Sequence, residues 1–112
     1  MKVARGFVRD QGMNGLEARY AAHLELRKRL GEIAWHAYQP LKLRLAKATY
    51  YDPDFLVMLA DGTLEVHEVK GGWWRDDARA KTKISAALFP FRFYGVTERP
   101  KAEGGGWQYE KF

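Results

Sequence analysis

The chain has 112 residues, enough for one domain with an apolar core and too few for two. Its hydrophobic fraction of 46% and aromatic fraction of 14% are those of a globular protein and exclude a disordered one. It contains no cysteine, which excludes disulfides and thiolate metal sites, and no apolar run approaches the length of a membrane span. The formal net charge of +5 favours an anionic partner, and nucleic acid is the commonest such partner.

The first half of the chain is predicted to fold as a helix followed by strands. Residues 1–13 are expected to form an irregular leader within the single domain, 1–112. Asn14 is a good N-cap for a helix that reaches about Leu30. The segment 35–46 alternates leucines with basic residues, which predicts a strand or a bent pair of strands. Its proline indicates an edge or a bulge within that segment.

A β-hairpin is predicted over residues 54–70, where apolar and alternating segments flank Ala60-Asp61-Gly62. If the loop is Asp61-Gly62 alone, Asp54 lies opposite Val69. If the loop also includes Ala60, with the glycine in the left-handed conformation, Asp54 lies opposite Glu68. The Asp-Gly pair suits either loop, so the register stays open on local grounds.

The register that includes Ala60 in the loop has a chemical consequence, and we prefer it. It puts Asp54, Glu68 and Lys70 on one face, at the end of an apolar stripe. Residues directly opposite have Cβ atoms roughly 4.5–5.5 Å apart, so the two carboxylates repel unless a cation or proton lies between them. A hard divalent cation such as Mg²⁺ or Mn²⁺ fits oxygen ligands of this kind. Paired acids with a lysine can support metal-assisted attack of water on a phosphodiester.

A second helix is predicted after the hairpin, capped by Asp76 and reaching about Leu88. Its expected inner face consists of Ala80, Ile84, Ala87 and Leu88. Strands are expected at 91–96 and, after a glycine-rich loop, at the edge position 107–112. A helix between two strands is compatible with a parallel crossover, and the whole order is compatible with an α/β sandwich.

Pro53-Asp54 followed by Glu68-x-Lys70 resembles the signature of the PD-(D/E)XK nuclease superfamily. The flanking order is similar to that of small stand-alone nuclease-like proteins of bacteriophages, distant relatives of phage junction-resolving endonucleases. The elements that carry this likeness are Asn14-x-x-Glu17, Tyr51-x-Pro53-Asp54-Phe55, the tryptophan pair, the basic helix and Pro90-Phe91-Arg92-Phe93. The resemblance covers the chain from about Asn14 onward. It implies a restriction-endonuclease-like αβββαβ core with a mixed four- to five-stranded sheet.

The resemblance also implies roles for the site residues. Asp54, Glu68 and the main-chain carbonyl of Val69 would hold the metal. Lys70 would orient or deprotonate the attacking water, or stabilise the charge on a phosphorane-like transition state. Glu17 has two interpretations that do not exclude each other. It can close a capping box with Asn14, or it can be a third acid that binds or positions the metal.

Candidate nucleic-acid contacts follow the strand that ends at Lys70. They are Trp73, Trp74, Arg75, Arg79, Lys81 and Lys83. The tryptophans could stack on unpaired bases, or they could cover the core or a dimer contact. The basic side chains would form a diffuse phosphate-binding surface, although helix lysines are often only solvated. Lys83, at the border of the predicted buried face, could reach a phosphate near the site. Histidines such as His67 are interpreted as structural, and Glu65 as a surface acid.

These features predict a Mg²⁺- or Mn²⁺-dependent endodeoxyribonuclease of phage type, located in the cytoplasm of an infected or lysogenic bacterium, without a membrane partner. No appended sequence-reading domain is expected, which favours structure- or shape-directed cleavage. Branched DNA is one candidate substrate, and a homodimer would place two sites on two strands. The alternative is a non-catalytic nucleic-acid-binding protein that retains the nuclease fold. A structural or assembly protein with an incidental basic surface is a further alternative.

Overall fold

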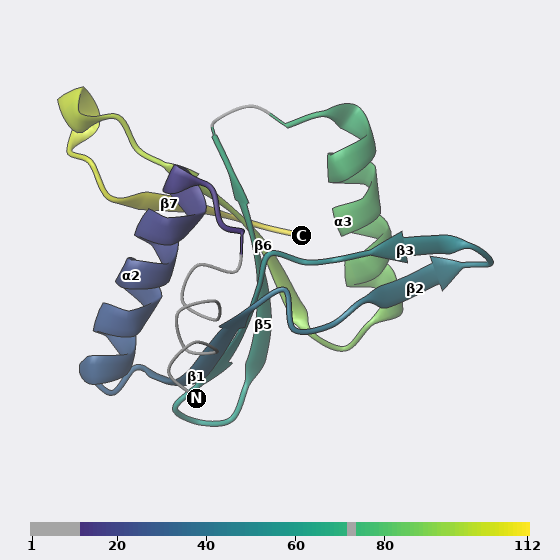
Figure 1. Ribbon diagram of the computed structural model, residues 1–112, viewed down its shortest axis with the longest axis horizontal. Coiled ribbons are helices and arrows are strands. Elements are labelled where there is room, and N and C mark those ends of the chain that lie inside the picture. The colour runs from purple at the N-terminus through teal and green to yellow at the C-terminus, as the bar shows by residue number, and fades with distance from the viewer. Residues whose placement is uncertain (1–11, 72–73) are drawn as a thin grey trace.

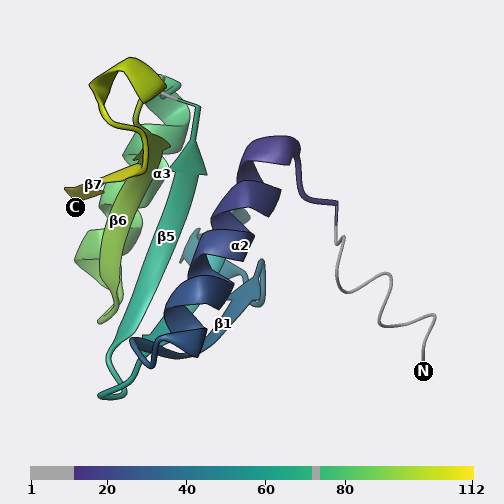
Figure 2. The same ribbon diagram turned by 90° about the vertical axis from the view of Figure 1, so that its left-hand side faces the viewer.

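A computed structural model describes residues 12–71 and 74–112. A main sheet is flanked by helix α2 (Gly15–Arg29) on one face and helix α3 (Asp76–Leu88) on the other (Figures 1 and 2). The predicted α/β class is therefore confirmed, while most of the predicted leader lies outside the described residues. Within the described ranges, no helix is both long and apolar enough to cross a bilayer.

The main sheet is mixed and has five strands in the order β1-β4-β5-β6-β7. Their bounds are β1 (Ile33–Tyr38), β4 (Phe55–Leu59), β5 (Leu64–Lys70), β6 (Arg92–Glu98) and β7 (Trp107–Lys111). Strands β5 and β6 run parallel and are joined through α3, whereas the other three neighbouring pairs are antiparallel. The parallel crossover and the final edge strand are thus confirmed.

Helix α2 begins as its sequence predicts. Asn14 accepts a hydrogen bond from the Glu17 amide at 2.8 Å, and Glu17 accepts one from the Asn14 amide at 3.0 Å. This reciprocal capping box satisfies two amides that the first helical turn leaves without partners. It also fixes Glu17 at the N-terminal end of the helix, while Tyr20 and Leu24 are buried against the sheet.

The hairpin adopts the register that includes Ala60 in the loop. Phe55 pairs with His67 and Met58 with Leu64, and the Leu59 amide donates to the Thr63 carbonyl at 2.8 Å. Gly62 has a φ of +91°, a conformation that a side chain would strain. Extending the ladder by one step places Asp54 opposite Glu68, so the preferred register is confirmed.

Helix α3 has the predicted bounds but not the predicted inner face. Its buried residues are Thr82 and Ser85, whereas Ile84 is 47% exposed and Leu88 is 55% exposed. The hydroxyls of Thr82 and Ser85 donate to carbonyls one turn earlier, at 3.0 and 2.8 Å. Because these hydroxyls are satisfied within the helix, the two short side chains can face the sheet at little cost. The predicted cap is also wrong: Arg75 is the N-cap and makes no side-chain cap bond.

A second sheet replaces part of the predicted bent strand. Strands β2 (Leu43–Ala46) and β3 (Thr49–Tyr51) form an antiparallel hairpin that extends over α3 (Figure 1). The proline of this segment lies between β1 and β2, where the chain leaves the main sheet. Leu43 and Tyr51 pack with the core residue Phe93. This hairpin therefore brings Tyr51 to the α3 side of the sheet.

Candidate active site

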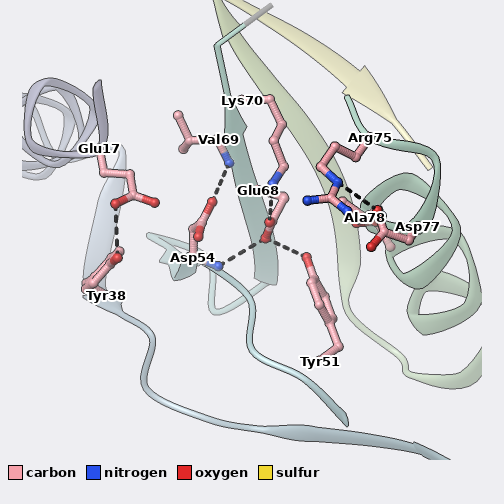
Figure 3. Close-up of polar contacts among 11 residues, drawn as sticks. Glu17, Tyr38, Tyr51, Asp54, Glu68, Val69, Lys70, Arg75, Asp77 and Ala78 are labelled. Carbon is pink, nitrogen blue, oxygen red and sulfur yellow. Dashed lines mark hydrogen bonds and ion pairs between the residues drawn. The ribbon is translucent and has the colours of Figure 1, made fainter. Parts of the chain in front are cut away.

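Asp54 is fixed where strand β4 starts. Its carbonyl accepts a hydrogen bond from the Gln39 amide at 2.7 Å, and its Oδ2 accepts one from the Val69 amide at 2.8 Å. The main-chain ladder between β4 and β5 ends at Phe55, so the carboxylate takes over as the partner of the Val69 amide. Asp54 is only 7% exposed, which holds its side chain in one position beside β5 (Figure 3).

Glu68 lies beside Asp54 on β5 and is 6% exposed. Its Oε1 accepts hydrogen bonds from the Tyr51 hydroxyl at 2.7 Å and from the Asp54 amide at 3.2 Å. Its Oε2 lies 3.2 Å from the Lys70 ammonium. The three residues Asp54, Glu68 and Lys70 are thus brought together, with Tyr51 completing the set (Figure 3).

The pKa of Asp54 is raised to about 8, first by burial and then by the negative charge of Glu68. The Val69 amide and Lys70 oppose this shift, and Glu17 adds to it. With this raised pKa, the Asp54 carboxyl stays protonated near neutral pH. The positive charge and hydrogen-bond donors around it do not offset the cost of ionising it in a buried position. A divalent cation at this point would supply the missing positive charge.

Lys70 is positioned by an aromatic ring as well as by its acid partner. Its ammonium lies 5.5 Å from the centroid of the Trp74 ring. Trp74 lies over Gly95, where an added Cβ would come within 2.5 Å of the indole. Gly95 pairs with Glu68 in the parallel ladder, so this glycine lets the indole lie beside the site.

Glu17 is near the site but does not join the pair directly. Its Oε1 accepts hydrogen bonds from the Tyr38 hydroxyl and the Asn14 amide, both at 3.0 Å. Figure 3 places the Glu17–Tyr38 pair on the side of Asp54 away from Lys70. The capping interpretation of Glu17 is confirmed, and its charge also reaches Asp54.

The donor set suits a hard cation held partly by water. In the described ranges, no group of three or more His, Cys, Asp and Glu side chains is arranged to hold a metal. Asp54 and Glu68 supply carboxylates. The N–H and C=O of a strand residue point to the same neighbour, so the Val69 carbonyl points past the start of β4, toward Asp54. Mg²⁺ usually keeps several waters and needs only one or two carboxylates, so these donors fit it.

The side chains predicted to contact nucleic acid differ in exposure and in the interactions that they already make within the protein. Arg79 forms an ion pair with Glu110 and lies over the rings of Trp74 and Phe112. The Lys81 ammonium donates to the Tyr50 carbonyl at 3.3 Å, and Lys83 is exposed.

Two further predicted contacts precede α3 in the sequence. Arg75 is exposed and forms an ion pair with Asp77 at 3.4 Å. Trp73 lies outside the described residues. The predicted position of Lys83 beside a buried Ile84 is wrong, because Ile84 is exposed and the buried residues of α3 are Thr82 and Ser85.

The opposite face of β5 holds a polar network that sequence reasoning missed. His67 donates or accepts with Glu65 at 2.9 Å and with the Tyr20 hydroxyl at 2.6 Å, and Tyr20 contacts the Tyr109 hydroxyl at 3.0 Å. Glu65 is buried, not on the surface, and Arg92 lies 3.9 Å from it. The network ties α2 to the sheet, consistent with a structural histidine.

Comparison with protein-family models, curated protein sequences and solved structures gave no match.

Proposed function

We propose that the protein is a Mg²⁺- or Mn²⁺-dependent endonuclease that hydrolyses phosphodiester bonds in DNA. The observation that carries this proposal is the buried pair of acids Asp54 and Glu68, together with the ion pair between Lys70 and Glu68. Paired buried acids are costly for stability, and binding nucleic acid alone does not require them. The order helix, strands, helix, strand and the mixed sheet are compatible with the nuclease core that the sequence resembles.

The metal would be held by Asp54, Glu68 and the Val69 carbonyl, and when bound it would polarise the phosphate and acidify a water. In the reaction, the oxygen of water attacks phosphorus and loses a proton to solvent, while the P–O bond to the leaving sugar breaks and the leaving oxygen takes up a proton from solvent. The Lys70 ammonium forms an ion pair with Glu68 and carries three N–H donors. These donors would orient the water or stabilise charge on the phosphate oxygens. Tyr51 and the Asp54 amide hold the Glu68 carboxylate in place.

Branched DNA is the substrate that the resemblance to junction-resolving endonucleases favours. The deciding experiment incubates the purified protein with branched, single-stranded and duplex DNA and with matched RNA. Each substrate is tested with Mg²⁺, with Mn²⁺ and with EDTA. We expect cleavage of DNA with either metal and none with EDTA. Binding without cleavage under every condition would instead support the non-catalytic nucleic-acid-binding alternative.

The exposed basic residues of α3 provide a prediction about binding. If Lys81 and Lys83 each contact one phosphate, log affinity for duplex DNA falls with log salt by about 0.9 per contact. The double variant Lys81→Ala/Lys83→Ala should therefore flatten the salt dependence by about 1.8, measured by fluorescence anisotropy in EDTA. An unchanged slope would show that these lysines are only solvated.

A further inference from the structure

We propose that an open basic hollow on the α2 side of the sheet binds backbone phosphates of the nucleic-acid substrate. The inference rests on the proposed function for the nature of its ligand, and it adds a surface distinct from α3. The hollow has a volume of about 570 Å³ and lies between α2 and the connection from β6 to β7. Its charged lining residues are Arg19, Glu98, Arg99 and Lys101.

The charges of this hollow leave a positive surplus. Glu98 accepts hydrogen bonds from Arg19 Nη2 at 2.9 Å and from Arg19 Nε at 3.3 Å, so this acid is neutralised by that arginine. Within the described part of the chain, Arg99 and Lys101 form no ion pair. Two cations are thus available in a concave surface, where like charges reinforce the attraction for an anion.

The connection is shaped to leave space for a ligand. The 3-10 helix η1 (Lys101–Glu103) is followed by Gly104, Gly105 and Gly106, with φ of +102°, +66° and +82°. A Cβ at any of these glycines would meet nothing within 4 Å. The Arg99 amide donates to the Gly106 carbonyl at 2.8 Å and closes the loop. At Gly105 and Gly106 the wall of the hollow is therefore bare backbone, which a phosphate can approach closely.

The hollow lies at the same end of the sheet as the carboxylate pair. Lys70 pairs with Thr97 in the parallel ladder, and the residue after Thr97 begins the lining of the hollow. On the other side, Arg19 follows Glu17 in the first turns of α2. Figures 1 and 2 show the start of α2, the end of β5 and η1 together at one end of the molecule. Lys70 lies on the α3 face of β5 and the hollow on the α2 side, so a nucleic acid that contacts both would pass around this end of the sheet.

The test compares two double variants that remove the same charge. Arg99→Ala/Lys101→Ala alters the hollow, and Lys28→Ala/Arg29→Ala alters the exposed last turn of α2, at the other end of that helix. Affinity for labelled duplex and single-stranded DNA is measured by fluorescence anisotropy in EDTA over a range of salt. We expect the first variant to flatten the slope by about 1.8 on duplex and about 1.4 on single strands, and the second to leave it unchanged.

An unchanged slope in the hollow variant, or an equal change in both variants, would overturn the inference. If the alanine variant unfolds, as judged by its thermal midpoint, Arg99→Gln/Lys101→Gln keeps polar side chains and gives the same test. The result is separable from the proposed function. Loss of the salt effect in a protein that still cleaves DNA rejects the hollow alone. A salt effect in a protein that cleaves nothing rejects the nuclease and retains the hollow.

Discussion

Glu68→Gln and Asp54→Asn should each lower the rate of DNA cleavage at least about 100-fold, as should Lys70→Ala. The first two changes remove a charge but almost no volume, and the Asn at position 54 can still accept from the Val69 amide. The fold should therefore persist while the ability to hold a cation is lost. Single-turnover cleavage at saturating enzyme measures the chemical step directly.

A matched control for this series is Asp61→Asn. Asp61 is an exposed acid in the β4–β5 loop, at the far end of the same hairpin, where it accepts from the Thr63 amide at 2.9 Å. An Asn can keep that bond, so cleavage by this variant should equal that of the wild type. Full activity in Asp54→Asn or Glu68→Gln would reject the metal site, whatever the sequence pattern suggests.

The hairpin register shows how far local sequence can predict the site. Asp61-Gly62 allowed two loops, and only the one that includes Ala60 puts Asp54 opposite Glu68. The structure adopts that loop, with the left-handed conformation taken by Gly62. Turn geometry reduced the register to two possibilities, and the two-residue period of a strand fixed which side chains share a face in each. The chemistry of the paired acids, not local geometry, selected between them.

Contacts between distant segments were not predictable in the same way. Tyr51 reaches Glu68 because the β2–β3 hairpin folds over α3, and no local pattern indicates that path. The inner face of α3 was predicted wrongly because apolar spacing suggested Ile84 and Leu88. The helix instead buries Thr82 and Ser85, whose small size permits close approach and whose hydroxyls bond within the helix. An analysis of periodicity uses only the polarity of each side chain, so it gives no information on the hydrogen bonds that allow a hydroxyl to be buried.

The stability that Asp54 contributes to the metal-free protein should be lost as pH rises from about 4 to about 8. Burial and the charge of Glu68 raise the pKa of Asp54 to about 8, above its ordinary value. The folded state therefore binds more protons than the unfolded state in this window, and the free energy of unfolding falls with increasing pH.

Asp54→Asn should remove this slope and leave the protein more stable than the wild type at pH 8 in EDTA. Burial lowers the pKa of His67, so that residue costs stability below about pH 6.5 in both proteins, and their difference isolates Asp54. Urea unfolding across the pH range measures the effect, with Asp52→Asn as the control. Asp52 is an exposed acid that lies 3.1 Å from Lys42, so its loss should change little.

Added Mg²⁺ should stabilise the wild type at pH 8 but not Asp54→Asn, because a cation that binds the ionised pair favours the folded state. If the free energy of unfolding changed with pH in parallel for the wild type and Asp54→Asn, the pKa of Asp54 would not be raised in the folded protein. A cation would then not be needed at this site.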